Sequence, residues 1–363
     1  MTHENDIHVT QPTLAPLAEL HPLLEQIWKS GILTHNGPLV RQFEKDAARS
    51  LGITNLVATA SGTIALQMGI KALNLTGEII TTPFTFVATT SAILWQNCTP
   101  VFADIDPDTF NIDPDSIEAR ITNRTSAIMP VHIFGNPCAV QAIAQIARRH
   151  HLHVLYDAAH AAGVQYAGRS ILEYGDMSAT SFHATKILNT VEGGGCVTTD
   201  RELHERLKRM RFYGYDDSRH MIDHGFNGKM TEVHAAVGIA NLKYLRKTLD
   251  DRKEKYALYK EILSTHGDLK FQKISRDCNC CYFPVVFPDE TTLLKIVQAL
   301  NEQHVFPRRY FHPPVNTFPG MAPSRFHTPK SDNLAKRILC LPLYLKLEKD
   351  KIEHIATRIL HFL

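Results

Sequence analysis

The sequence predicts an α/β protein with a large domain, in which a mostly parallel mixed sheet lies between helices, and a smaller C-terminal α/β domain. Its 363 residues are 44% hydrophobic and 21% charged, which is ordinary for a globular protein and long enough for two domains. Between residues 55 and 200, short apolar runs alternate with helical patterns, which is typical of parallel strands joined by right-handed crossovers. A second pattern begins near Cys281, so we expect a large domain over 1–250 and a small domain over 251–363.

The individual elements are predicted from the spacing of apolar residues. Residues 14–50 have apolar side chains at helical spacing, interrupted at 31–38 by a loop rich in turn residues. In the rest of the large domain, strands are expected at 55–59, 78–82, 100–105, 126–131, 152–157, 177–182 and 195–200. Helices are expected at 62–74, 84–96, from 114, and at 140–150, 201–211 and 231–263. For the small domain we expect a strand at 282–287, a helix at 291–303, a proline-rich stretch at 307–329 and a last helix at 350–362.

Charge and composition exclude several classes of protein. The net charge of +2 gives no basic surface for nucleic acid or for an anionic membrane. No stretch is long and apolar enough to span a bilayer, and the polar residues 1–6 do not resemble a secretory signal, so we expect a cytoplasmic protein. The seven cysteines indicate no disulfide framework. The spacing of Cys278, Cys280 and Cys281 is not that of a zinc site, so we expect no metal.

A lysine follows the apolar run at 177–182. Lys186 lies in a polar turn, Ser-Phe-His-Ala-Thr-Lys, which continues to Glu-Gly-Gly-Gly at 192–195 before the next apolar run. A lysine amine can form a Schiff base with a carbonyl compound when its neighbours orient it or lower its pKa. The alternative is an ordinary lysine on a surface loop.

A carboxylate ends another apolar run, 29 residues before this lysine. Asp157 closes the strand predicted at 152–157, and the carboxyl ends of parallel strands are where open α/β sheets bind ligands. If Lys186 binds pyridoxal phosphate, Asp157 is the natural partner of the pyridine nitrogen. By itself, Asp157 could instead be the N-cap of a helix. The two residues together, each at a strand end, favour the cofactor.

Two further segments fit the same cofactor. Ser61, Gly62 and Thr63 lie between a predicted strand and a predicted helix, so their N–H groups form an anion site suited to a phosphate, although the same residues also suit a plain N-cap. The Ser181 hydroxyl can join them. Phe86 follows a strand end at the ligand edge of the sheet, where its ring could cover a pyridine ring or simply pack in the core.

Taken in order, these motifs resemble the DegT/StrS family of pyridoxal phosphate-dependent nucleotide-sugar aminotransferases. The set comprises Ser-Gly-Thr, Thr-Phe-Val-Ala-Thr, Asp-Ala-Ala-His-Ala, Ser-Phe-His-Ala-Thr-Lys and Glu-Gly-Gly, and the likeness covers nearly the whole chain. It implies a type I aminotransferase fold, a homodimer with active sites shared between the subunits, and pyridoxal 5′-phosphate, with pyridoxamine 5′-phosphate as its aminated form.

The resemblance also assigns roles to residues of this chain. It implies that the catalytic residues are Lys186, Asp157, His160 and His183, with Lys186 as the covalent attachment point. The cofactor would be held by Gly62, Thr63, Phe86, Asp157, His160, Ser181, Lys186 and Asn227, and the substrate by Thr34, Asn36, Arg309, Tyr310 and His312. His312 stands where members of similar type carry tyrosine, and His35 stands where an asparagine is common.

The reaction implied is transfer of an amino group, from L-glutamate, to C-4 of a nucleotide-linked 4-keto-6-deoxy sugar such as dTDP-4-keto-6-deoxyglucose, for amino-sugar and lipopolysaccharide O-antigen synthesis. Lys186 favours amino transfer, because members that act as dehydratases have histidine there. Members that act at C-3 tend to read Ser-Phe-Tyr-Pro-Gly-Lys with Asp-Gly-Gly. The alternatives are a 3-keto sugar nucleotide aminotransferase and a non-catalytic regulator that binds the cofactor. A Rossmann dehydrogenase is disfavoured, because no GxGxxG follows the first strand.

The expected dimer depends on Asn227. This residue lies about 40 residues beyond Lys186, outside the strand–helix alternation, so nothing in the local pattern brings it to residues 61–63 of its own chain. The family resemblance brings it to the phosphate of the neighbouring subunit's cofactor. We therefore expect two composite sites in a homodimer.

Overall fold

The computed structural model describes residues 6–321 and 327–363. The polar N-terminal residues 1–5 and positions 322–326 of the proline-rich stretch lie outside the described residues. Within the described part, no helix is long and apolar enough to cross a membrane.

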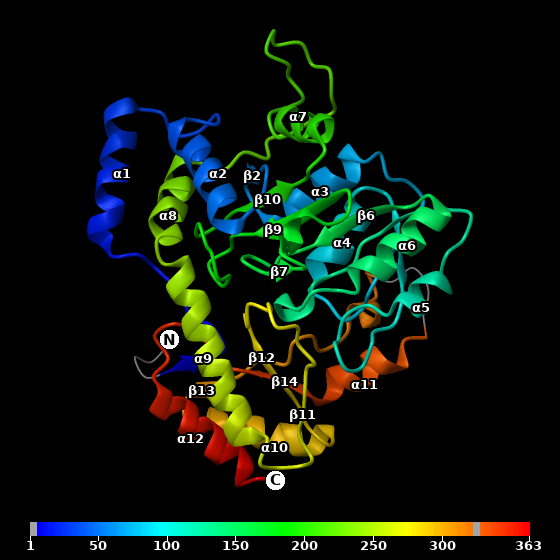
Figure 1. Cartoon of the computed structure of the whole chain (residues 1–363), viewed down its shortest axis with the longest axis vertical. Coiled ribbons are helices and arrows are strands. Elements are labelled where there is room, and N and C mark those ends of the chain that lie inside the picture. Colours follow the sequence, from blue (N-terminus) through cyan, green and yellow to red (C-terminus); the bar gives the residue numbers. More distant parts are fainter. Residues whose placement is uncertain (1–5, 322–326) are drawn as a thin grey trace.

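A seven-stranded sheet forms the centre of the larger part of the molecule (Figure 1). Its spatial order is β2-β10-β9-β6-β5-β3-β4, and every neighbouring pair is parallel except the two that involve β10. The strands are β2 (Val57–Thr59), β3 (Glu78–Thr81), β4 (Thr99–Phe102), β5 (Thr125–Ile128), β6 (His153–Asp157), β9 (Met177–Ser181) and β10 (Gly194–Val197). The sheet is therefore mostly parallel and mixed, as the sequence predicts.

Helices cover both faces of this sheet, which explains why its strands read as continuous apolar runs. One face packs against α3 (Gly62–Ala72), α4 (Val87–Trp95) and α7 (Arg201–Met210). The other packs against α2 (Pro38–Leu51), α5 (Pro114–Glu118), α6 (Val140–His150) and α8 (Glu232–Leu242). Successive residues of one strand serve opposite faces: Leu155 packs in the first core and Val154 in the second.

A second, smaller sheet lies in the C-terminal part. It has the order β11 (Lys270–Phe271), β12 (Phe283–Val286) and β14 (Ile338–Leu341), and its pairs are antiparallel. It shares a core with α9 (Leu245–Leu263), α10 (Glu290–Asn301) and α12 (Lys349–Leu360). The remaining strands and α-helices are β1 (Ile7–His8), which pairs with β13 (Val305–Phe306), the hairpin β7 (Gln165–Tyr166) and β8 (Arg169–Ser170), and the helices α1 (Leu17–Ser30) and α11 (Pro329–Arg337).

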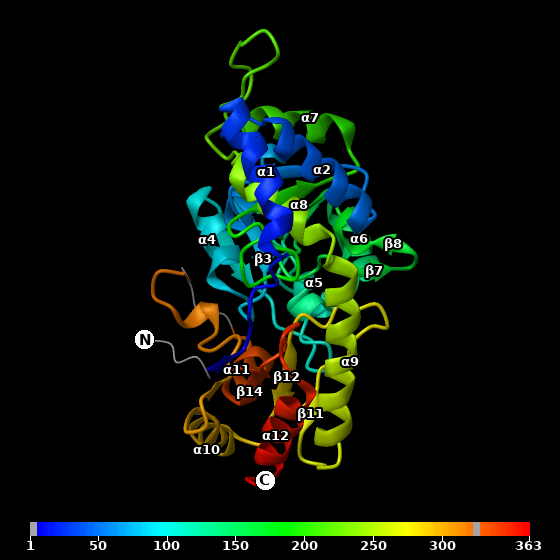
Figure 2. The ribbon, with the colours of Figure 1, turned by 90° about the vertical axis from the view of Figure 1, so that its left-hand side faces the viewer.

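The long α9 helix links the two parts (Figures 1 and 2). Leu245 packs in the core of the large sheet, whereas Tyr259 and Leu263 pack in the core of the small one. Residue 250, the predicted domain boundary, thus falls inside a helix. The division of the chain at that residue stays a prediction.

Two predicted helices differ from those in the structure. The single helix predicted over 231–263 is wrong: it is broken between α8 and α9, where Tyr244 is the N-cap of the second helix. Apolar periodicity continues through the break, so the pattern gave no sign of it. The helix predicted over 84–96 begins only at Val87, because Phe86 keeps an extended backbone as its N-cap.

A buried carboxylate joins α2 to α8. The N-cap of α2, Gly37, has no side chain to satisfy the first N–H groups of the helix. The Glu232 carboxylate accepts those bonds instead, from Leu39 N at 2.8 Å and Val40 N at 3.0 Å, and the side chain is buried. An anion at a helix N-terminus also complements the helix dipole.

We therefore predict that Glu232→Ala lowers the free energy of unfolding by about 3 kcal/mol, because two buried N–H groups lose a charged acceptor. Urea denaturation of the cofactor-free protein measures the change. The matched control is Glu205→Ala, which removes a pair with Lys208 on the exposed face of α7 and should cost less than about 1 kcal/mol. Equal losses in the two variants would contradict this role for Glu232.

Candidate active site

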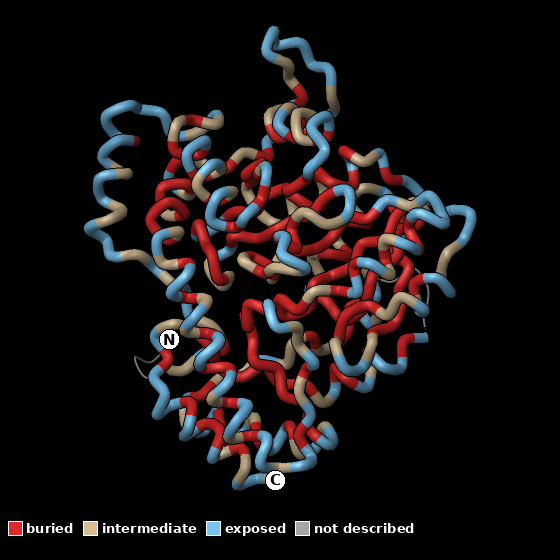
Figure 3. Tube along the Cα trace, viewed as in Figure 1, coloured by how far each residue is buried: buried red, intermediate tan, exposed pale blue. Residues whose placement is uncertain are grey.

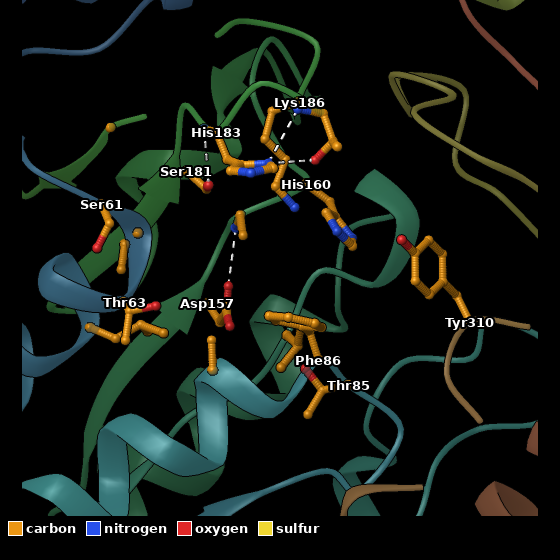
Figure 4. A pocket seen from close by; sticks show the side chains of 18 of the residues that line it. Ser61, Thr63, Thr85, Phe86, Asp157, His160, Ser181, His183, Lys186 and Tyr310 are labelled. Carbon is orange, nitrogen blue, oxygen red and sulfur yellow. Dashed lines mark hydrogen bonds between the residues drawn. The ribbon is translucent and has the colours of Figure 1, made fainter. Parts of the chain in front are cut away.

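A cavity of about 280 Å³ lies at the carboxyl ends of strands β2, β3, β6 and β9 (Figure 4). This edge of an open α/β sheet is where ligands bind. Nine of the residues predicted from the sequence line it: Gly62, Thr63, Phe86, Asp157, His160, Ser181, His183, Lys186 and Tyr310. The cavity therefore brings together residues from four strand ends and from the C-terminal part of the chain.

Lys186 follows β9 in a tight turn, in which its N–H donates to the carbonyl of His183 at 2.9 Å. Among the described residues, its amine has no hydrogen-bond partner. Burial lowers the pKa of this amine, while the Cys281 thiol and the Asp157 carboxylate oppose the shift. A lysine with a lowered pKa in an apolar cavity is suited to nucleophilic attack on a carbonyl carbon.

Asp157 ends β6 and is buried beside the cavity. Its Oδ2 accepts from the Thr89 hydroxyl at 2.7 Å, and its Oδ1 accepts from the N–H of Ala159 at 3.1 Å. Burial raises the pKa of the carboxyl group, whereas these two bonds and the Lys186 amine lower it. A carboxylate in such surroundings is stabilised by a cationic ring nitrogen.

The start of α3 packs tightly against β9. A Cβ added to Gly62 would lie 2.9 Å from the Cβ of Ser181, so only glycine permits this approach. The Ser61 hydroxyl accepts from Ile64 N at 3.2 Å, which makes Ser61 a helix N-cap. The first N–H groups of a helix have no partner within it, so the same turn can also bind an anion.

Two histidines line the cavity in different ways. His160 is stacked nearly parallel to Phe134 and Phe311, and its Nδ1 is buried without a partner in the described part of the chain. Burial, and then the charge of the Lys186 amine, lower the pKa of His160 well below its usual value, which favours the neutral ring. His183 is more exposed. Its Nδ1 accepts from Thr185 N at 3.2 Å, and its Nε2 lies 3.6 Å from a Glu192 carboxylate oxygen.

Five predicted residues do not line this cavity: Thr34, Asn36, Asn227, Arg309 and His312. Arg309 donates instead to Glu290 at 2.5 Å and to the carbonyl of Lys336 at 3.0 Å. The ring of His35, next to Thr34, packs edge-on against Phe212, 5.4 Å away.

The position of Asn227 corrects one sequence argument. Ala60 N donates to the carbonyl of Gly228 at 2.9 Å, and Lys229 forms a β-bridge with Thr59. The segment that contains Asn227 thus lies beside the Ser61 turn of its own chain, although the sequence pattern suggested no such approach. The reason is that β2 is an edge strand whose free side this segment joins. Its distance along the sequence is no argument for a second subunit.

Several lining residues were not predicted, including Thr85, Glu192, Tyr282 and Phe311. Thr85 belongs to the Thr-Phe-Val-Ala-Thr motif and Glu192 to the Glu-Gly-Gly motif, so the sequence contained a signal for both. Tyr282 and Phe311 come from the C-terminal part, where no local pattern pointed to a ligand.

The cavity fits pyridoxal phosphate in five respects. It holds an amine that has no hydrogen-bond partner among the described residues, a buried carboxylate that favours a cation, and the N-terminus of a helix for a phosphate. The Phe86 ring, 59% exposed although apolar, is available to stack on a planar ligand. The unpartnered Nδ1 of His160 could bond to a polar substituent of that ligand. In the described residues, no group of three or more His, Cys, Asp and Glu side chains could hold a metal ion.

Comparison with known proteins gives consistent matches. A model of the DegT/DnrJ/EryC1/StrS aminotransferase family matches residues 18–360. The dTDP-4-amino-4,6-dideoxy-D-glucose transaminase of Shigella dysenteriae is 40% identical over 365 residues, which cover 98% of this chain and 99% of that protein. The protein of the same name from Escherichia coli is 37% identical over 369 residues, covering 99% of each.

A solved structure is also similar over the whole chain. The structure of DesI in the presence of its TDP-sugar product superposes with a TM-score of 0.93 at 35% identity, covering 99% of this chain and 94% of that chain. Together with the mixed sheet described above, this likeness confirms the predicted fold class.

The burial of Asp157 leads to a prediction of how the stability of the folded protein depends on pH. Because burial raises the pKa of Asp157 in the folded protein, the contribution of this residue to stability falls as pH rises through the unfolded and then the folded pKa. An asparagine there could still accept from Ala159 N and donate to Thr89. We expect cofactor-free Asp157→Asn to melt a few degrees above the wild type near about pH 8, with the gap closing toward about pH 4.

Thermal melting at several pH values measures this difference. Asp217→Asn, at an exposed carboxylate in a loop, is the control and should show no such trend. A variant of Asp157 that melts below the wild type at the higher pH would contradict the prediction.

Proposed function

This chain belongs to the DegT/DnrJ/EryC1/StrS aminotransferase family, whose members depend on pyridoxal phosphate, and we propose that it aminates C-4 of a nucleotide-linked 4-keto-6-deoxy sugar. The substrate we infer is dTDP-4-keto-6-deoxyglucose, and the amino donor L-glutamate. The observation that carries this choice is that two relatives, similar over their whole length, both bear the name of the transaminase for the corresponding 4-amino sugar. The product would serve amino-sugar synthesis for lipopolysaccharide in the cytoplasm.

The residues of the cavity support such a reaction. When bound, pyridoxal phosphate supplies an electron sink that makes the carbon next to the transferred nitrogen acidic. Lys186 Nζ would hold the cofactor covalently and, once released, take up and return the proton at that carbon. The lowered pKa of this amine favours its neutral, basic form. Asp157 would hold the proton on the ring nitrogen, and Phe86 would cover one face of the ring.

We assign the residues that would bind the phosphate and the sugar from where they lie in the structure. Gly62, Thr63 and Ser181 meet where α3 begins, so they would hold the phosphate group. Tyr310 lines the cavity from the C-terminal part and could contact the sugar. Thr34, Asn36, Arg309 and His312 would reach the substrate only outside the cavity that one chain forms.

We further propose that the protein is a homodimer with shared sites. Three large apolar side chains on helices of the larger part are about three-quarters exposed: Leu17 (73%) and Trp28 (74%) on α1, and Trp95 (75%) on α4. Most of the α1 helix is exposed along its length (Figure 3). A second subunit that covers them would remove this surface from water. The same subunit could supply Asn227 to the phosphate.

The choice of substrate is tested by single turnover. Protein loaded with pyridoxamine 5′-phosphate is mixed with dTDP-4-keto-6-deoxyglucose, with GDP-4-keto-6-deoxymannose or with a 3-keto sugar nucleotide, and the cofactor's absorbance is followed. We expect the first sugar to react fastest. Lys186→Ala, loaded in the same way, should react about 10²- to 10⁴-fold more slowly, because it lacks the group that moves the proton.

The other possible outcomes of this experiment would support a different function. A faster reaction with the 3-keto sugar would replace the proposed C-4 activity by the C-3 alternative. Failure with every sugar, although cofactor is bound, would favour the non-catalytic regulator. Borohydride reduction followed by peptide mapping should find the cofactor on Lys186, and a label on another lysine would overturn that assignment.

Sharing of sites is tested by mixing two inactive variants, Lys186→Ala and Asn227→Asp. If Asn227 serves the other subunit, each mixed dimer has one site with both lesions and one intact site. Random exchange makes half of the dimers mixed, so about a quarter of wild-type activity should return. No recovery, with subunit exchange proven by a tag on one variant, would show that Asn227 serves its own chain.

A further inference from the structure

We propose that Thr89, supported by Thr85, is a positioning residue that fixes the Asp157 carboxylate and keeps it ionised for the ring nitrogen of the cofactor. The inference rests on the proposed function. Thr85 and Thr89 are the two ends of the Thr-Phe-Val-Ala-Thr motif, but the sequence analysis assigns neither a role in the site, and Thr89 does not line the cavity. It acts through Asp157.

The contact joins elements that are far apart in the sequence. Thr89 Oγ1 lies 2.7 Å from Asp157 Oδ2, across 68 residues, and the two side chains are 0% and 5% exposed. Threonines in helices often bond to a carbonyl of their own preceding turn. The hydroxyl of Thr89 instead points from the first turns of α4 to the end of β6.

The hydrogen bonds have only one possible direction when Asp157 is ionised. A carboxylate can only accept, so the single hydroxyl hydrogen of Thr89 is donated to Asp157. The second bond of Thr89, at 2.9 Å to Thr85 Oγ1, must then be donated by Thr85. The result is a chain from Thr85 to Thr89 to Asp157, in which each bond strengthens the next.

This series of hydrogen bonds matters because Asp157 has little else to stabilise its charge. Among the described residues, its other side-chain hydrogen bond comes from a single backbone N–H, that of Ala159, at 3.1 Å. Burial favours the protonated acid, which has no negative charge to keep a ring nitrogen protonated. A hydroxyl that donates to Oδ2 counteracts burial and also fixes the orientation of the carboxylate.

The turn that starts α4 thus has two functions. Phe86, its N-cap, presents a ring to the cavity, while Thr85 and Thr89, four residues apart, lie on one side of the turn. One short segment therefore places both the stacking ring and the support of the carboxylate. A displacement of this turn would disturb both together.

The chain offers a matched set of variants. Thr89→Val removes the hydroxyl at almost unchanged volume, and Thr89→Ser keeps it. Thr90→Val is the control, because Thr90 is also buried on α4 but its hydroxyl has no partner among the described residues. Thr85→Val removes only the first donor in the series of hydrogen bonds from Thr85 to Asp157.

The first measurement is thermal melting of the cofactor-free protein as a function of pH. Without Thr89, the pKa of Asp157 in the folded protein should rise further, so stability is lost as pH rises through that range. We expect Thr89→Val to lower the melting temperature more near about pH 8 than near about pH 5, and Thr89→Ser and Thr90→Val to show no such trend. In the Asp157→Asn background, the effect of Thr89→Val should no longer depend on pH.

The second measurement is turnover of the holoenzyme. Thr89→Val should lower kcat about tenfold to a hundredfold, because a hydrogen bond to a charged group is lost, with a smaller loss for Thr85→Val. Thr89→Ser should restore most of the rate. Equal losses in Thr89→Val and Thr89→Ser, or an unchanged pH dependence of melting in Thr89→Val, would overturn the inference. If the wild type aminates no sugar, the proposed function fails, but the melting series still decides whether Thr89 stabilises the ionised Asp157.

Discussion

The carboxylate of Asp157 lies at the buried end of β6, where the loss of water disfavours its charge. Among the described residues, only the Thr89 hydroxyl and the N–H of Ala159 donate hydrogen bonds to it. A nearby cation further stabilises such an anion, and a protonated ring nitrogen is such a cation. Lys186, another ionisable group beside this carboxylate, is in a similar position. The Lys186 amine lies near enough to affect the carboxylate's ionisation, yet it makes no hydrogen bond within the described residues.

Close backbone packing brings the Ser61 turn to this point. The antiparallel strand β10 lies between β2 and β9, and Gly194 pairs with both Thr59 and Ser181. A Cβ at Gly194 would lie 2.4 Å from Gly62 N, and one at Gly62 would meet Ser181. Glycine is thus required in two separate motifs for the same steric reason, because the start of α3 packs directly on two strand ends.

The C-terminal part completes the site rather than standing apart from it. The side-chain amide of Asn279 donates to the carbonyls of His160 at 2.7 Å and Ala162 at 2.9 Å, which fixes the loop after Asp157. Tyr282, Tyr310 and Phe311 close the cavity from the same side. A relative movement of the two parts would therefore change the surroundings of His160, and through it the space in which a substrate must fit.

The sequence by itself determined the central residues of the site. A strand is recognisable from a local apolar run, and in a parallel sheet its carboxyl end lies at the ligand edge, so Asp157, Lys186 and the Ser61 turn could be placed without coordinates. Only the tertiary structure decided which side chains those residues meet. The Thr89–Asp157 bond, the Glu232 cap on α2 and the contact of Gly228 with Ala60 span 68, 193 and 168 residues. They depend on the spatial order β2-β10-β9-β6-β5-β3-β4, which differs from the order along the chain. Periodicity reports only which face of an element is apolar, whereas strand order is set by the packing of the whole sheet.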